Sequence, residues 1–164
     1  MNSKTDPAMT VETVGETDVV VTRRFNAPRS LVWRAYTEPA LVRRWMLGMP
    51  GWSMPVCDID LRVGGGYHYR WRNDENGTEF GFIAVFHAIE PEHRIVNTER
   101  PEDVDMPEAE IEVLFEPLGD MTEMKMVIRY ADAVSRKAAL DTGMTDGMGT
   151  SFDLMDDVLA EVAG

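Results

Sequence analysis

The chain has 164 residues and a formal net charge of −13, with 29 acidic and 16 basic side chains. This length suits one domain with a sizeable core, and the scattered basic residues do not form the cluster that phosphate neutralisation requires. We therefore expect no nucleic-acid partner and no binding to an anionic membrane surface.

The beginning of the chain carries no targeting or membrane segment. It has no apolar signal region, and no run approaches the roughly 18 apolar residues of a membrane span, so we expect a cytoplasmic protein. Residues 1–15 show no periodicity and are expected to be a flexible lead-in to a single domain over 16–164. Cys57 is the only cysteine and alternates with Ile59 and Leu61, which is typical of a buried structural thiol.

The first elements expected in chain order are a strand and two short helices. The β-branched run at 18–25 predicts a strand. Pro28 favours a helix start, because its missing N–H costs little in a first turn, and Pro39 begins a second short helix. Glycine and proline at 48–51 then predict a loop that carries Trp52.

Six more strand candidates follow, most with the two-residue alternation of a half-buried strand. Asn76-Gly77 predicts a hairpin turn between two of them. Gly64-Gly65-Gly66 does not open a helix, so we expect a bulge or kink that bends the sheet and no phosphate-binding loop. The candidates cover residues 56–63, 67–72, 78–89, 93–99, 109–116 and 121–130.

The last expected element is one long helix over 135–162, with Ser135 as its N-cap. Apolar residues at steps of three or four draw a Met-rich stripe along it. Three glycines near its start each cost about 1 kcal/mol relative to Ala, so residues 143–149 are expected to be less protected than 152–159. The stripe consists of Met144, Met148, Phe152, Met155, Leu159 and Val162.

This order of elements predicts an α+β fold with an antiparallel sheet, because adjacent strands are joined by short turns and the helices are segregated from them. A long helix with one apolar stripe needs a broad apolar partner. We therefore expect a curved sheet of six or seven strands that wraps around the terminal helix.

Several stretches resemble one known superfamily, the helix-grip proteins with START-like and birch-pollen-allergen-like domains. Within it, the chain is similar to the bacterial branch related to the activator of the heat-shock chaperone ATPase. The resemblance spans about residues 18–162 and lies in the order and spacing of the motifs. They are RFNAP at 24–28, VWRAYT at 32–37, LVRRW at 41–45, the glycine-containing run 58–69, IEPEHRIV at 89–96 and GMTDGMGTSFD at 143–153.

The resemblance implies a helix-grip fold with an apolar cavity between the terminal helix and the sheet. It does not imply one activity, since the superfamily includes lipid carriers, cyclases, oxygenase subunits and chaperone regulators. The family often carries a Trp where Gly149 or Thr150 stands here. That departure either enlarges the cavity or reflects a repacked core.

The expected function is binding of a small hydrophobic molecule, lipid-like or aromatic, by a carrier or sensor. Flexible Met side chains suit an adaptable apolar site, although a sheet and a helix also bury such faces as closed core. The candidate pocket-lining residues are Trp45, Trp52, Tyr67, Tyr69, Trp71, Phe80, Phe82, Phe86, Met124, Met126, Ile128, Met144, Met148 and Phe152.

Catalysis is the first alternative. A register break at the glycines would turn His68, Arg70, Arg72 or Glu79 inward, where an arginine polarises a carbonyl in cyclase-type or hydrolase-type chemistry. Alternation instead places these charges on the face opposite the aromatics, as solvated cross-strand pairs. We therefore assign no catalytic residue and expect no cofactor.

Metal and protein partners are the remaining alternatives. His68, His87 and His93 lack ligand spacing, so we expect no metal site. A chaperone role ranks lowest, because the eukaryotic activator works with an additional N-terminal domain that 164 residues cannot hold. Met49 and Trp52 fit either a pocket lid or an interface, and the sequence leaves the oligomeric state open.

Overall fold

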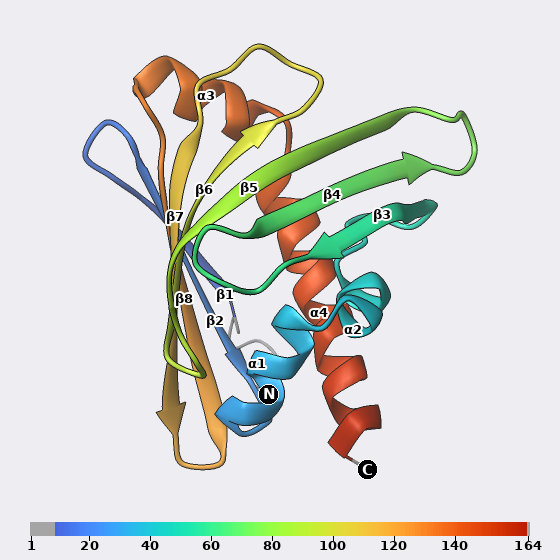
Figure 1. The fold of residues 1–164 in the computed structure, drawn as a ribbon, viewed down its shortest axis with the longest axis vertical. Coiled ribbons are helices and arrows are strands. Elements are labelled where there is room, and N and C mark those ends of the chain that lie inside the picture. Colours follow the sequence, from blue (N-terminus) through green and yellow to red (C-terminus); the bar gives the residue numbers. More distant parts are fainter. Residues whose placement is uncertain (1–8, 164) are drawn as a thin grey trace, which may run out of the picture.

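The structure, a computed structural model, describes residues 9–163 and has the expected α+β helix-grip architecture (Figure 1). One antiparallel sheet of eight strands has the order β1-β2-β8-β7-β6-β5-β4-β3. The elements in chain order are β1 (Met9–Val14), β2 (Asp18–Phe25), α1 (Arg29–Thr37), α2 (Pro39–Trp45), β3 (Trp52–Ile59), β4 (Gly66–Asn73), β5 (Glu79–Glu90), β6 (Arg94–Pro101), β7 (Ala109–Leu118), β8 (Met121–Arg129), α3 (Ala133–Asp141) and α4 (Met144–Ala163).

Strand β1 is an addition to the sequence prediction, which placed no element before Asp18. It pairs with β2 along its whole length, from Met9 opposite Arg23 to Val14 opposite Asp18. Most of its side chains are exposed, so backbone hydrogen bonds hold it and no apolar pattern marks it. The rest of the predicted flexible lead-in, residues 1–8, lies outside the described residues.

The strand predicted at 56–63 is displaced, because β3 already begins at Trp52 and ends at Ile59. Leu61 and Val63, which continue the alternation, instead lie exposed in the turn to β4. Gly64 and Gly65 belong to this turn, and Gly66 is the first residue of β4. Gly66 enters β4 where a Cβ would lie 1.8 Å from the Ala84 carbonyl oxygen, so only glycine fits.

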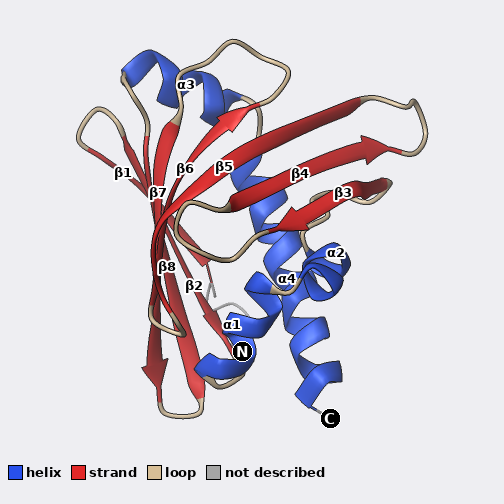
Figure 2. Ribbon diagram, viewed as in Figure 1, coloured by secondary structure: helices blue, strands red, loops and turns tan. Residues whose placement is uncertain are grey.

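Helices α1, α2 and α4 lie on the concave side of the curved sheet, and α3 lies at one end (Figure 2). The prediction of one helix over 135–162 was wrong, because Gly143 has a left-handed φ of 81° that ends regular helix between α3 and α4. The N-cap is Asp132, whose carboxylate accepts a hydrogen bond of 2.7 Å from the Ser135 backbone N–H.

The main core lies between the sheet and α4 from Phe152 onwards, whereas Met144 and Met148 of the first turns are only partly buried. The Phe152 ring meets the Phe25 ring of β2 edge-on at 5.7 Å between centroids, and Met155 and Leu159 continue the buried stripe. Each such side chain contributes about 1.5–3 kcal/mol when it leaves water. The apolar stripe of α4 is therefore the centre of the core, as its periodicity predicted.

A buried arginine also joins the sheet to α4. Arg23 on β2 is only 3% exposed, and its guanidinium donates hydrogen bonds to Asp153 at 2.8 Å and to Asp156 at 2.9 Å.

Within residues 9–163 no helix is long and apolar enough to span a membrane.

Candidate functional site

An acidic residue stands on the concave, core-facing side of β6. Ile95, Asn97 and Glu99 alternate on this side, and the first two are buried. Glu99 lies opposite Ala84 of β5 on one side and Ala109 of β7 on the other. Because both neighbours are alanine, the sheet leaves room around the Glu99 carboxyl.

The Glu99 carboxyl accepts a hydrogen bond from the Tyr67 hydroxyl of β4. Ala84 is the register partner of both residues, so Tyr67, Ala84 and Glu99 form one row across three strands. Asn97 donates its side-chain N–H to the Tyr67 hydroxyl at 3.4 Å. The Tyr67 ring stacks on the Tyr69 ring with 4.1 Å between centroids, which fixes the position of its hydroxyl.

Burial raises the pKa of Glu99 from 4.5 to about 7, although the hydrogen bond from Tyr67 acts in the opposite direction. Burial raises the pKa of Tyr36 and of Tyr67, and it raises the pKa of Tyr130 to about 12. In all three the negative charge of Glu99 is the second largest cause. Burial also raises the pKa of Tyr69, with smaller contributions from the charges of Tyr36, Cys57 and Glu99. Tyr67 therefore bonds the carboxyl directly, and burial and the charge of the carboxyl raise the pKa of the other three tyrosines; we call the five residues the Glu99 cluster.

The cluster gathers residues from several elements. Tyr36 comes from α1, Tyr67 and Tyr69 from β4, Glu99 from β6, and Tyr130 directly follows β8. Tyr69 is 6% exposed, and the other four are partly exposed. The cluster is therefore largely shielded from water but still accessible from outside, which suits a group of residues that binds a ligand.

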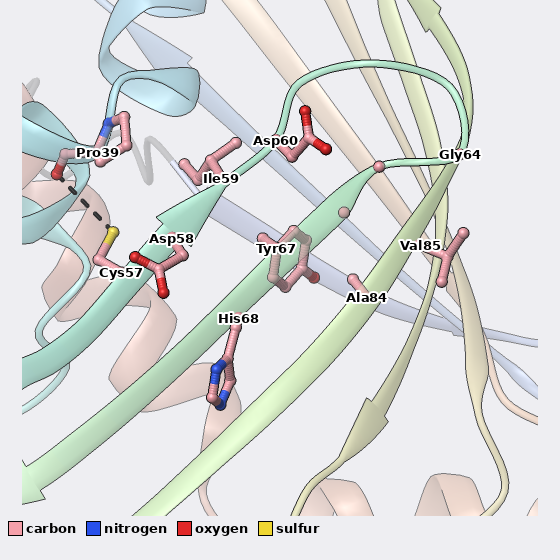
Figure 3. Close-up of a pocket in the computed structure, with 12 residues that line it drawn as sticks. Pro39, Cys57, Asp58, Ile59, Asp60, Gly64, Tyr67, His68, Ala84 and Val85 are labelled. Carbon is pink, nitrogen blue, oxygen red and sulfur yellow. Dashed lines mark hydrogen bonds between the residues drawn. The ribbon is translucent and has the colours of Figure 1, made fainter.

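An open pocket of about 690 Å³ reaches the cluster through Tyr67 (Figure 3). Pro39 at the start of α2 also lines the pocket, and its carbonyl oxygen accepts a weak hydrogen bond of 3.8 Å from the Cys57 thiol. Burial raises the pKa of the Cys57 thiol, as fits a structural residue. The residues that line the pocket are Pro39, Cys57, Asp58, Ile59, Asp60, Gly64, Gly65, Gly66, Tyr67, His68, Ala84 and Val85.

The predicted pocket residues separate into three groups, of which the first is closed core. Trp45 is almost fully buried and donates its indole N–H to the Ala35 carbonyl at 2.8 Å. The remaining members of this group, all buried against α1, α4 or the sheet, are Phe152, Met124, Met126 and Ile128.

The second group forms an aromatic row at the far end of β3, β4 and β5. Trp71 stacks on Phe80 with 5.0 Å between centroids, and Trp52 and Phe82 meet these rings edge-on. Phe80 is 41% exposed. The row is an open rim that continues into the Glu99 cluster, because the Trp71 ring meets the Tyr69 ring edge-on at 5.8 Å between centroids.

The third group lies at the cluster. Tyr67 and Tyr69 belong to it, and the Phe86 ring meets Tyr67 edge-on at 5.9 Å. The Tyr130 hydroxyl donates to the Met144 sulfur of α4 at 3.3 Å. Met148, one turn further along α4, is partly buried against the core.

The charged residues considered for catalysis lie on the convex face, as alternation predicted. Glu102 accepts hydrogen bonds from His68 at 2.9 Å and from Arg70 at 2.6 Å, and Glu79 accepts one from Arg70 at 3.1 Å. Arg72 is half-exposed on the same face, 3.8 Å from Glu79. Among the described residues, no group of three His, Cys, Asp or Glu side chains is placed to hold a metal ion.

Sequence reasoning missed Glu99 and Tyr36. Glu99 lies on the same face of β6 as Ile95, and the neighbouring strand β7 buries Ile111 and Val113 on that face. The sequence signal was therefore an acidic residue at a position that alternation assigns to the buried face. Tyr36 lies in the VWRAYT motif at 32–37, and nothing in that motif marks its hydroxyl as part of a site.

Comparison with known proteins identifies the fold and the family. No curated protein matches the chain. A crystal structure of a protein from Rhodobacter sphaeroides is 26% identical, with a TM-score of 0.86 over 93% of this chain and 99% of that one. A protein from Nitrosomonas europaea is also 26% identical, with a TM-score of 0.80 over 92% and 99%.

A solution structure of a protein from Arthrobacter aurescens shares the fold at 23% identity, with a TM-score of 0.84 over 94% of this chain and 92% of that one. The family model described as activator of Hsp90 ATPase homolog 1-like protein matches residues 26–160. That match covers most of the chain, which therefore belongs to this family of helix-grip proteins.

Proposed function

We propose that the chain binds a small, largely apolar molecule between α4 and the sheet, as a carrier or sensor. The observation that carries this function is the Glu99 cluster, a few convergent polar groups on an otherwise apolar concave wall. Small-molecule sites combine an apolar lining with a few placed polar groups, among them groups with a shifted pKa. The pocket lined by Tyr67 and Ala84 adjoins this cluster, and in this proposal it is the entrance.

The family is named after an activator of the Hsp90 ATPase. A chaperone complex would be a different function, one served by groups on the outer surface. The Glu99 cluster instead faces the interior, where its hydroxyls and its carboxyl meet only what enters the fold. Its position therefore favours a small molecule over a protein partner.

A neutral aromatic probe, 2-phenylethanol, tests the proposal in an NMR titration of the chain. Binding at the site predicts shifts of the Tyr67 and Tyr69 ring resonances and of the Met144 methyl resonance. Binding should be saturable, because one site is filled. If these resonances stay unchanged at millimolar probe while the protein remains folded, the proposal fails.

A matched pair of variants on β5 locates the binding. Ala84→Leu fills the space between Tyr67 and Glu99, so it should weaken probe binding by roughly tenfold or more. His87→Leu adds apolar bulk further along β5, at an exposed residue that bonds Thr98 on the convex face and does not line the pocket, and should leave binding unchanged. Equal effects of the two variants would place the probe elsewhere.

Acid–base catalysis is a second candidate, favoured by the pKa of about 7 at Glu99. A carboxyl with a pKa near the working pH exchanges protons efficiently in either direction. In this function Glu99 takes or gives the proton, and Tyr67 holds the carboxyl in place. Glu99→Gln should then abolish turnover of a bound substrate while the probe still binds.

A further inference from the structure

We propose that the Glu99 cluster selects small molecules that carry a protonated amine on an aromatic or alkyl body. This inference rests on the proposed function and names the ligand class of that site. It follows from the charge of the site, from the groups that face Glu99, and from the rings around it.

The Glu99 carboxyl has spare capacity to accept hydrogen bonds. A carboxylate offers about four acceptor positions, and among the described residues Glu99 accepts only the hydrogen bond from Tyr67. In the same part of the chain it forms no ion pair. A desolvated carboxylate without a cation is unfavourable, so a ligand that brings a positive charge relieves that cost.

The protein's own cations are committed elsewhere. Arg23 is the only buried basic side chain among residues 9–163, and it is paired with Asp153 and Asp156 of α4. His68 and Arg70 bond Glu102 on the convex face. The titratable group that bonds Glu99 is instead the Tyr67 hydroxyl of β4. The other groups whose pKa is raised by burial and by its charge are also hydroxyls, those of Tyr36 in α1, Tyr69 in β4 and Tyr130 at the end of β8.

The rings of the cluster add a second attraction for a cation. Tyr67 and Tyr69 present stacked ring faces, and Phe86 lies against Tyr67. The face of an aromatic ring is electronegative and attracts ammonium groups, and a tyrosine hydroxyl accepts a hydrogen bond from them as well. The net charge of −13 attracts cations from a distance and repels anions. Fatty-acid carboxylates are therefore unsuitable ligands for this site.

Three probes of similar shape separate the ligand classes: 2-phenylethylamine, 2-phenylethanol and 3-phenylpropanoate. In NMR titrations near pH 8, where Glu99 is ionised, the amine should bind roughly tenfold more tightly than the alcohol, and the carboxylate most weakly. Lowering the pH by about two units should weaken the amine by about tenfold, because Glu99 must first lose its proton. The alcohol should show no such dependence.

Two glutamate variants serve as a matched pair. Glu99→Gln should bring the affinity of the amine down to that of the alcohol. Glu110→Gln removes a carboxyl that bonds Arg129 on the convex face and should preserve the preference for the amine. The pH dependence of the unmodified chain provides an independent test that does not require a variant to fold.

Equal binding of amine and alcohol by the unmodified chain, or a preference for the amine that survives Glu99→Gln, would overturn the ligand class and leave small-molecule binding intact. If none of the three probes binds, the proposed function and the ligand class fall together. Tighter binding of the carboxylate would show that Glu99 does not set the charge preference.

Discussion

The Tyr67 hydroxyl on β4 donates a hydrogen bond to the Glu99 carboxyl on β6, across the whole width of strand β5. The contact exists because the residue between them, in register with both, is Ala84. A longer side chain at this position would stand between the two groups. One alanine in the sheet thus determines whether the carboxyl has a donor.

Tyr67→Phe removes that donor and should raise the pKa of Glu99 further above about 7, because the hydrogen bond favours the ionised form. The lost bond should also cost about 1 kcal/mol of the free energy of unfolding. A ¹³C NMR titration of the Glu99 carboxyl measures the pKa. Tyr130→Phe is the control, because its hydroxyl donates to Met144 instead. An unchanged or lowered pKa in Tyr67→Phe would contradict the assignment.

Glu99 should make the protein less stable as the pH rises from about 4.5 to about 7. The folded state holds its proton up to the raised pKa of about 7, whereas the unfolded state releases it near 4.5, so the folded state binds more protons between these values. The loss is at most about 3 kcal/mol.

Urea unfolding across this pH range measures the effect, and Glu99→Gln should flatten the decline. The lowered pKa values of Glu102 and Glu112, which arise first from hydrogen bonds with His68 and Arg94, affect stability only at more acidic pH. They therefore do not mask the contribution of Glu99. The same slope in both proteins would show that Glu99 is not desolvated.

Replacing Arg23 should destabilise the protein less than replacing both of its partners, Asp153 and Asp156. Arg23 is 3% exposed, whereas the two carboxylates are 80% and 40% exposed. Arg23→Met leaves carboxylates that water can solvate, but the double variant Asp153→Asn, Asp156→Asn leaves a buried guanidinium without a counter-charge. The double variant should therefore cost more, roughly 3–5 kcal/mol.

Thermal or urea unfolding of both variants measures this difference. Arg24→Met is the control, because Arg24 forms an exposed pair with Glu123 at 3.2 Å and should cost less than about 1 kcal/mol. A larger loss in Arg23→Met than in the aspartate double variant would overturn this reading of the pair.

Two glycines near the start of α4 should respond in opposite directions to alanine. Gly143→Ala should destabilise by about 1 kcal/mol, because the left-handed φ of 81° is unfavourable for a residue with a Cβ. Gly147→Ala should stabilise by up to about 1 kcal/mol, because nothing lies within 4 Å of the added Cβ and alanine favours helix. Urea unfolding measures both, and amide exchange over residues 144–150 should slow only in Gly147→Ala.

Alternation in the sequence predicted which face each strand turns to the core. It placed Tyr67 and Tyr69 inward and Arg70 outward, because a period of two depends only on neighbouring residues. The family resemblance supplied the helix-grip arrangement. The break at Gly143 was not predicted, since a glycine inside an apolar stripe shows its cost but not its φ.

The candidate site depends on information that no local pattern contains. Glu99 meets Tyr67 only through the register of three strands, and burial and the charge of Glu99 raise the pKa of Tyr36, which lies in a helix far away in sequence. Strand β1 was missed for another reason, because its side chains are exposed and only its pairing with β2 defines it. Side-chain periodicity therefore predicts faces, whereas register decides which polar groups meet.

The ion pairs of Arg23 have a consequence for the order of folding. They join residues that are 130 and 133 positions apart in the chain, and contacts so distant in sequence form late because loop closure must precede them. While the protein is being synthesised, the β2 guanidinium has no counter-charge until α4 has emerged from the ribosome. This arginine is then buried only when α4 docks, so the last helix in the chain completes the surroundings of a strand near its beginning.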